Sequence, residues 1–121
     1  MITLICYPKC TTCQKAQKWL DNHGIAYTYR DIKTDHPTYE ELSRWHAVSG
    51  LPLKKIFNTS GLLYKSMDLK NRLPGMSQEE MLRLLSTDGM LVKRPIVVGE
   101  DYVLVGFRES EWQSRMGTEA N

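Results

Sequence analysis

Two apolar runs flank one amphipathic segment in the N-terminal part of the chain. Residues 2–5 form the first run and predict a buried strand. In residues 14–23 apolar side chains recur three or four positions apart, which is typical of a helix, and Gly24 is placed to end it. Residues 25–32 are rich in β-formers and predict a second strand. This order indicates a parallel pair of strands joined by a right-handed crossover.

Helical patterns dominate the middle of the chain, from residue 36 to residue 89. Its two longer helices each open on a capping box, in which an N-cap Thr or Ser is followed three residues later by Glu. The boxes are Thr38 with Glu41 and Ser77 with Glu80. The shorter expected features are the end of a helix near Gly50, a helical turn over 51–56, a turn over 58–61, a helix over 62–69 and a break at 73–75.

Two β-branched runs, 96–98 and 102–105, are separated by a short polar link and predict a β-hairpin. A short helix over 109–115 and a polar tail follow. The order βαβ, helices, ββα is that of an α/β, thioredoxin-like fold with a mixed four-stranded sheet and a helical insertion. We expect one domain over 1–121, with its core in 1–35 and 90–115 and the insertion in 36–89.

Composition agrees with a globular protein, because 41% of the 121 residues are hydrophobic and 25% are charged. The formal net charge of +2 is too small to predict a nucleic-acid-binding protein or one that binds a membrane surface. No apolar run approaches the ~20 residues that a membrane span requires. We therefore expect a monomer with no direct nucleic-acid contact and no membrane association.

All three cysteines lie within residues 6–13, so they cannot cross-link a whole domain. A secreted disulfide scaffold would spread its cysteines along the chain, and we see no basic leader followed by a long apolar segment. We therefore expect a cytoplasmic protein. In that compartment a Cys-x-x-Cys motif is more often catalytic or metal-binding than structural.

Cys10 and Cys13 form such a motif where the first helix is expected to begin. Backbone N–H groups at a helix N-terminus carry about half a positive charge, which stabilises a thiolate at Cys10, and Lys9 adds a neighbouring cation. Cys13 lies one helical turn further on the same face, where it can attack a mixed disulfide formed at Cys10. The sequence therefore predicts thiol redox chemistry, with Cys10 as nucleophile and Cys13 as resolving residue.

Cys10 and Cys13 could instead be two small buried hydrophobic residues or half of a zinc site. The Cys6-x-x-x-Cys10-x-x-Cys13 spacing is also that of a radical-SAM iron–sulfur loop. A zinc site needs a second pair of ligands, but no cysteine lies outside the loop and the three histidines lack metal-ligand spacing. The iron–sulfur chemistry needs a barrel that a chain of this length and pattern does not supply. We expect no metal and no bound cofactor, and Cys6 is expected to end the first strand.

Two arginines near the hairpin are candidates for anion binding. In a thioredoxin-like layout Pro95 is expected to be cis and to face the Cys-x-x-Cys loop. Arg94 would then project near Cys10, where it stabilises a thiolate and offers a bidentate fork to an oxyanion. Arg108 either converges on the same place or is an exposed arginine at the start of the last helix. Lys54, Lys55, Lys65 and Lys70 are interpreted as a solvated face.

The chain resembles the arsenate reductase (ArsC)/Spx family over nearly its whole length. The resemblance rests on Tyr7-Pro8-Lys9-Cys10-Thr11-Thr12-Cys13, Phe57-Asn58-Thr59-Ser60-Gly61, Arg94-Pro95-Ile96 and Gly106-Phe107-Arg108. It implies a thioredoxin-like fold with the helical insertion. In the glutaredoxin-coupled arsenate reductases of this family, one loop cysteine, matching Cys10, attacks arsenate and glutathione resolves the adduct.

Three arginines bind the oxyanion in those reductases, and Arg94 and Arg108 stand at two of these positions. The third position falls near Asn58, where this chain has no arginine. Those reductases also lack a cysteine at the position of Cys13. That residue is similar to the second member of the redox pair in Spx-type regulators, which bind the C-terminal domain of the RNA polymerase α-subunit.

Two hypotheses follow. In the first, the protein is a thiol-disulfide oxidoreductase that acts on a small oxyanion or a disulfide. Cys10, Cys13 and Arg94 are its catalytic residues, and Arg108, Pro95 and Lys9 bind substrate. Thioredoxin, glutaredoxin or glutathione reduces it afterwards. In the second, it is an Spx-like regulator whose cysteine redox state controls binding to the RNA polymerase α-subunit.

Overall fold

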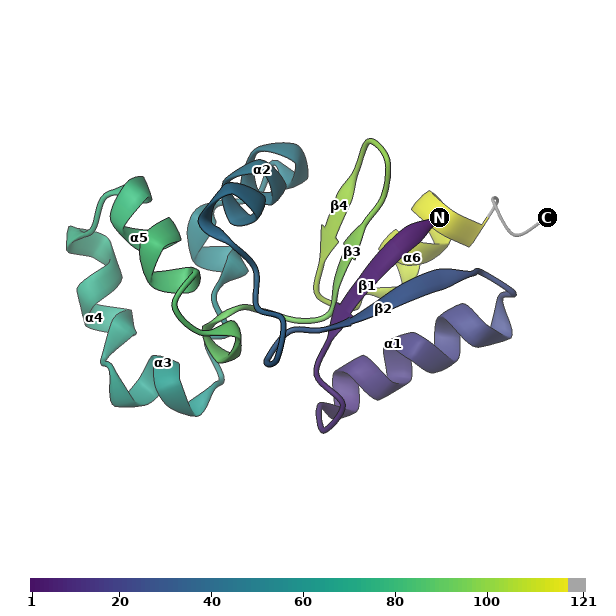
Figure 1. Ribbon diagram of the computed structural model, residues 1–121, viewed down its shortest axis with the longest axis horizontal. Helices are drawn as coiled ribbons and strands as arrows, with labels where there is room; N and C mark the ends of the chain where they lie inside the picture. The colour runs from purple at the N-terminus through teal and green to yellow at the C-terminus, as the bar shows by residue number, and fades with distance from the viewer. Residues whose placement is uncertain (118–121) are drawn as a thin grey trace.

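The computed structural model describes residues 1–117 and has six α-helices and four strands in that range (Figure 1). Residues 118–121 of the predicted polar tail and of the predicted domain lie outside the described residues. The elements are β1 (Ile2–Cys6), α1 (Thr11–Asn22), β2 (Tyr27–Asp31), α2 (Tyr39–Ser49), α3 (Leu62–Ser66), α4 (Leu69–Arg72), α5 (Gln78–Leu85), β3 (Ile96–Val98), β4 (Val103–Val105) and α6 (Glu109–Met116), with 3-10 turns at Leu53–Ile56, Leu73–Gly75 and Gly89–Leu91.

The four strands form one mixed sheet in the order β2-β1-β3-β4. Strands β1 and β2 are parallel and are joined through α1, which confirms the predicted βαβ unit. Strand β3 is antiparallel to β1 and to β4, and β3 and β4 form the predicted hairpin. The predicted α/β, thioredoxin-like fold is therefore confirmed.

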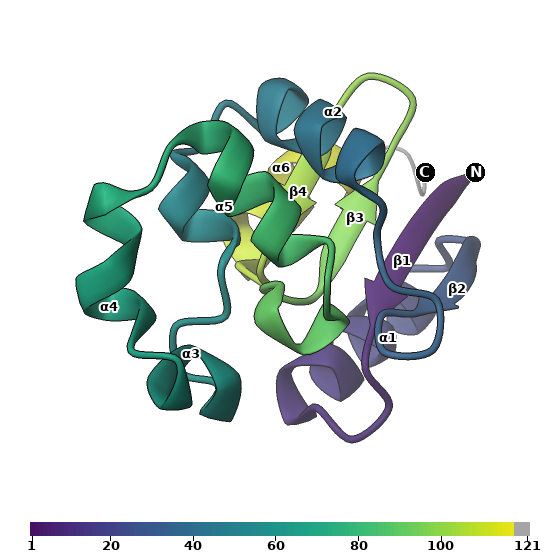
Figure 2. The same ribbon diagram turned by 60° about the vertical axis from the view of Figure 1, so that its left-hand side comes forward.

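Alternate residues of β1 supply the two faces of the sheet. Leu4 and Cys6 point to one face, where they pack with Trp19 of α1 and Trp112 of α6. Ile5 points to the other face and packs with side chains of α2 and of the helical insertion. Figures 1 and 2 show this layering, with α1 and α6 on one side of the sheet and α2 on the other.

Local signals place most helix ends correctly. Both predicted capping boxes are present, at Thr38 and at Ser77. The predicted helix ends at Gly24 and Gly50 coincide with left-handed backbone, with φ of 66° and 70°. The predicted helix over 62–69 is instead two helices, α3 and α4. Asp68 interrupts it with a φ of 52°, a conformation that ends a helical turn.

A segment in the middle of the insertion pairs with the segment that follows the insertion and leads into β3. The backbone N–H of Asn58 donates to the carbonyl of Leu91 (2.8 Å), and the N–H of Lys93 donates to the carbonyl of Ile56 (2.7 Å). Between these bonds, Phe57 forms an antiparallel bridge with Val92. This pairing brings Asn58 to the segment that leads into β3.

No helix within residues 1–117 is long and apolar enough to cross a membrane.

Candidate functional site

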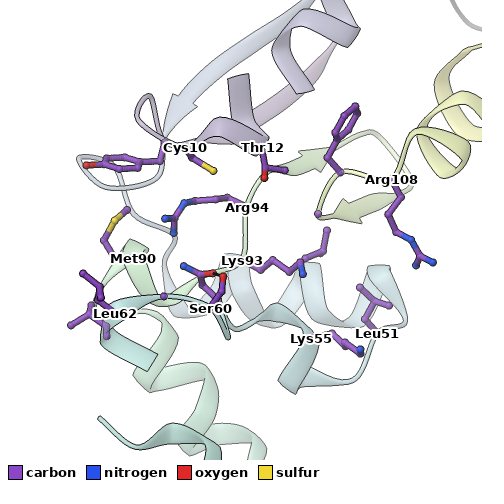
Figure 3. Close-up of a pocket in the computed structure, with 17 residues that line it drawn as sticks. Cys10, Thr12, Leu51, Lys55, Ser60, Leu62, Met90, Lys93, Arg94 and Arg108 are labelled. Atoms are coloured by element: carbon purple, nitrogen blue, oxygen red, sulfur yellow. Dashed lines mark hydrogen bonds between the residues drawn. The ribbon is translucent and has the colours of Figure 1, made fainter. Parts of the chain in front are cut away.

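A cleft of about 1090 Å³ opens at the N-terminus of α1, between the α1 loop, the hairpin ends and the helical insertion (Figure 3). We call it the Cys10 cleft. Its walls come from four parts of the chain that the sheet and the paired segments bring together. The lining residues are Tyr7, Cys10, Thr12, Leu51, Lys55, Asn58, 60–63, Met90, Lys93, Arg94 and 105–108.

Cys10 is the N-cap residue of α1 and is half-buried, with extended backbone angles (φ −86°, ψ 119°). Its N–H donates to the carbonyl of Tyr7 (3.0 Å), and its own carbonyl accepts from the N–H of Gln14 (3.0 Å). The side-chain amide of Gln14 donates back to the carbonyl of Pro8 (2.9 Å). The loop thus holds Cys10 at the positive end of the helix, inside the cleft. Helix α1 begins at Thr11, three residues earlier than the apolar pattern predicts.

Cys13 lies behind Cys10 and is 1% exposed. Its Sγ accepts from the backbone N–H of Tyr7 (3.4 Å) and from the thiols of Cys6 and Cys10. The bond from Cys6 is the foremost cause that lowers the pKa of Cys13 from 9.0 to about 6. The Tyr7 and Cys10 bonds and the charge of Arg94 act in the same direction, against burial. These contacts therefore favour the thiolate form of Cys13.

Cys6 is 0% exposed and faces Cys13 from the end of β1. Its hydrogen bond to Cys13 and its burial raise the pKa of the Cys6 thiol, so Cys6 remains a neutral donor. All three cysteines are free thiols in this structure. Within residues 1–117, no group of three or more His, Cys, Asp or Glu side chains is arranged to hold a metal ion.

Arg94 lies beside Cys10 in the cleft, as the sequence predicts (Figure 3). The Arg94–Pro95 peptide bond is cis, which was also expected. The guanidinium carbon lies 5.4 Å from the centre of the Tyr7 ring, and one terminal N–H donates weakly to the carbonyl of Val92 (3.4 Å). Arg94 Nε is buried and makes no hydrogen bond with any residue from 1 to 117. The guanidinium therefore retains donors for an anionic ligand.

The three predicted substrate-binding residues lie in different places. Arg108 is the N-cap residue of α6 and lines the cleft, but its guanidinium points away from Cys10 in Figure 3. Lys9 is exposed and Pro95 is buried, and neither lines the cleft. Pro95 instead accepts a hydrogen bond from the N–H of Gly106 (2.8 Å), which ties the start of β3 to the end of β4.

Lys55 and Lys93 line the cleft, and the sequence did not identify either as a site residue. Lys55 is exposed, as expected for a solvated face, but that interpretation missed its position at the cleft. The pairing of the two segments around Phe57 and Val92 brings Lys55 toward Lys93. That pairing leaves no periodic signal in the sequence. Asn58 also lines the cleft.

The model of the ArsC family matches residues 6–115 of this chain. The uncharacterized protein YusI of Bacillus subtilis is 46% identical over 112 residues, which are 93% of this chain and 95% of YusI. The global transcriptional regulator Spx of Staphylococcus saprophyticus is 29% identical over 111 residues, 92% of this chain and 83% of the regulator. Among solved structures, an ArsC family related protein from Bacteroides fragilis is 54% identical with a TM-score of 0.92, covering 93% of this chain and 95% of that one.

Proposed function

Because the chain belongs to the ArsC family, we propose that it is a thiol-disulfide oxidoreductase, with Cys10 as nucleophile and Cys13 as resolving thiolate. One observation carries this proposal. Of the three cysteines, Cys10 is the one that lines the cleft, while Cys13 lies behind it within hydrogen-bonding contact. A substrate can therefore reach Cys10 from the cleft, and Cys13 can reach the adduct from the protein side.

The reaction on a disulfide proceeds in two displacements. Cys10 gives up its thiol proton as its sulfur attacks one substrate sulfur, the substrate S–S bond breaks, and the first thiolate product leaves and takes up a proton. Cys13 then attacks Cys10 Sγ and releases the second thiolate. The protein has lost two electrons as a Cys10–Cys13 disulfide, and the substrate has gained them. An external thiol reductant (thioredoxin, glutaredoxin or glutathione) returns the protein to the dithiol state.

Arg94 has two roles in this proposal. Its positive charge favours thiolates in the cysteine cluster, and its free donors orient an anionic group of the substrate next to Cys10. Arg108 lies further along the cleft and would contact a part of the substrate away from the reacting sulfur. An arsenate site with three arginines is less well supported, since the turn around Asn58, where the resemblance places the third arginine, has none.

The test is a single-turnover reaction of the reduced protein with a model disulfide, followed by mass spectrometry. Cys10→Ser should abolish the reaction, with a loss of at least about a hundredfold in rate, because no other cysteine lines the cleft. Cys13→Ser should still react but stop at a stable mixed disulfide on residue 10. Exposed Lys70→Gln serves as a control that changes neither step. A Cys10→Ser protein that reacts at the rate of the unsubstituted protein would disprove the proposal.

A second candidate function, redox-controlled regulation of transcription, is favoured by the match to Spx over 92% of this chain. In that case oxidation of Cys10 and Cys13 would change affinity for a partner such as the C-terminal domain of the RNA polymerase α-subunit. A pull-down of that domain by the reduced and by the oxidised protein separates the two candidates. Binding that depends on redox state would favour the regulator, and no binding in either state would exclude it.

A further inference from the structure

The Cys10 cleft is much larger than a small oxyanion requires. Its volume of about 1090 Å³ is at the upper end of the ~300–1000 Å³ typical of small-molecule pockets. Cys10 and Arg94 occupy only a part of it. In Figure 3, Leu62 and Met90 lie to one side of them, and the lining continues on the other side toward Lys55 and Leu51. The cleft therefore has room for an extended ligand whose reacting sulfur lies at Cys10.

Every charged side chain that lines the cleft is positive. Lys55, Lys93, Arg94 and Arg108 contribute four cations, and no Asp or Glu lines it. None of these four side chains forms an ion pair with another residue between 1 and 117. Cations gathered in a concave site without acidic partners produce a positive potential that attracts anions. The buried Nε of Arg94, beside Cys10, adds a donor that has no hydrogen-bond partner within residues 1–117.

Apolar and neutral polar groups separate these cations. Leu51, Leu62, Met90 and Phe107 line the cleft, and Leu62 is 87% exposed. The side chains of Asn58 and Ser60 lie among them and can donate and accept hydrogen bonds. A ligand with methylene groups and amide bonds would contact both the apolar and the polar side chains of this lining. A small inorganic anion would leave the apolar side chains exposed to water.

We propose that the substrate of this site is an extended peptide disulfide with at least two carboxylates, held with its disulfide at Cys10 and its carboxylates along Lys55, Lys93 and Arg94. This proposal rests on the thiol-disulfide function and specifies its substrate class. Cys10 attacks one sulfur of the peptide disulfide and the first peptide leaves as a thiolate. Cys13 releases the second peptide, and the dithiol of the protein supplies both electrons.

Three peptide disulfides of different charge test the proposal: the symmetric dimers of acetyl-Glu-Cys-Glu-amide, its neutral isostere acetyl-Gln-Cys-Gln-amide, and acetyl-Lys-Cys-Lys-amide. The reduced protein is mixed with each dimer, quenched with acid, and its oxidation is followed by mass spectrometry. At low ionic strength the Glu dimer should react at least about tenfold faster than the Lys dimer, after division by the rate of each dimer with a free small thiol. The ratio of the Glu-dimer rate to the Lys-dimer rate should fall several-fold at 1 M salt, where the Debye length is ~3 Å.

The matched variants are Lys55→Gln/Lys93→Gln and Lys65→Gln/Lys70→Gln. Both lose two positive charges, but Lys65 and Lys70 are exposed residues outside the cleft lining. The first should reduce the Glu-to-Lys ratio at least about threefold and the second should leave it unchanged. Equal rates for the three dimers, or equal effects of the two variants, would overturn the substrate proposal and leave the thiol-disulfide function standing. No reaction with any dimer would overturn both.

Discussion

The three cysteines near the start of α1 have three different environments. Cys6 is buried with a raised pKa, Cys13 is buried with a lowered pKa, and Cys10 lines the cleft. The hydrogen bond from Cys6 is the foremost cause of the lowered pKa of Cys13. A thiolate is the reactive form of cysteine, so a lowered pKa suits Cys13 to resolve an adduct on Cys10.

Cys6→Ala should raise the pKa of Cys13 from about 6 toward 9.0, because the strongest hydrogen bond to its thiolate is lost. In the unsubstituted protein the resolving step should slow as the pH falls through about 6, since protonation removes the nucleophile. In Cys6→Ala this decrease should move to higher pH. NMR titration of protein with ¹³Cβ-labelled cysteine assigns the pKa of Cys13 directly. A Cys13 that titrates at the same pH with and without Cys6 would contradict the assignment.

Contacts between side chains of different elements hold the helices to the sheet, and a clear example joins β2 to α2. Arg30 of β2 forms a bidentate pair with Glu41 of α2, with N–O distances of 2.6 and 2.9 Å. Glu41 also accepts from the N–H of Thr38 (3.0 Å), which closes the capping box. One carboxylate therefore caps a helix and ties it to the sheet. The capping box is visible in the sequence, but its arginine partner is not.

Glu41→Gln should lower the free energy of unfolding by about 1 kcal/mol at pH 7, a modest value because the pair is partly exposed. The hydrogen bond from Arg30 lowers the pKa of Glu41 from 4.5 to about 2. A depressed carboxyl pKa stabilises the fold above pH 4.5 and ceases to do so as the pH falls toward 2. The difference between the two proteins in urea denaturation should therefore shrink over that pH interval.

Glu80→Gln is the matched control for Glu41→Gln. Glu80 closes the second capping box, at Ser77, and its side chain is exposed with no arginine bonded to it within residues 1–117. Its substitution should destabilise the protein less than Glu41→Gln does. Equal effects at pH 7 would mean that the capping bond, and not the Arg30 pair, accounts for the role of Glu41.

The sheet domain and the insertion pack against each other (Figure 2). Residues of both line the Cys10 cleft. Gly89, at the end of the insertion, packs directly against the backbone of Ile32, just after β2. A Cβ on residue 89 would overlap the carbonyl oxygen of Ile32. The close approach of two backbones therefore requires glycine at this position.

Gly89→Ala should destabilise the whole protein by about 2–3 kcal/mol, because backbone on both sides must move to admit the methyl group. Gly75→Ala is its control, since a Cβ there meets no atom within 4 Å, and it should be neutral or slightly stabilising. Thermal unfolding monitored by circular dichroism measures both. A Gly89→Ala protein as stable as Gly75→Ala would show that the insertion does not dock through this contact.

Sequence analysis predicted the fold, the capping boxes and the proximity of Cys10 and Arg94, because these depend on local pattern and on a recognisable layout. It missed the interruption at Asp68, which depends on one left-handed residue within an otherwise helical stretch. It also missed Lys55 and Lys93 at the cleft. Their position depends on pairing between segments more than thirty residues apart, which neither periodicity nor spacing records.

Hydrophobic periodicity, helix caps and the Cys-x-x-Cys spacing already establish a strand that leads two thiols to a helix N-terminus. These signals depend on residues within one or two helical turns of each other, so the local sequence is enough to specify them. Which thiol is buried and which reaches a ligand depends on packing against β3 and α6. The charge and length of the cleft depend on the docking of the insertion. These properties arise from contacts between distant segments, and they exist only once the chain has folded.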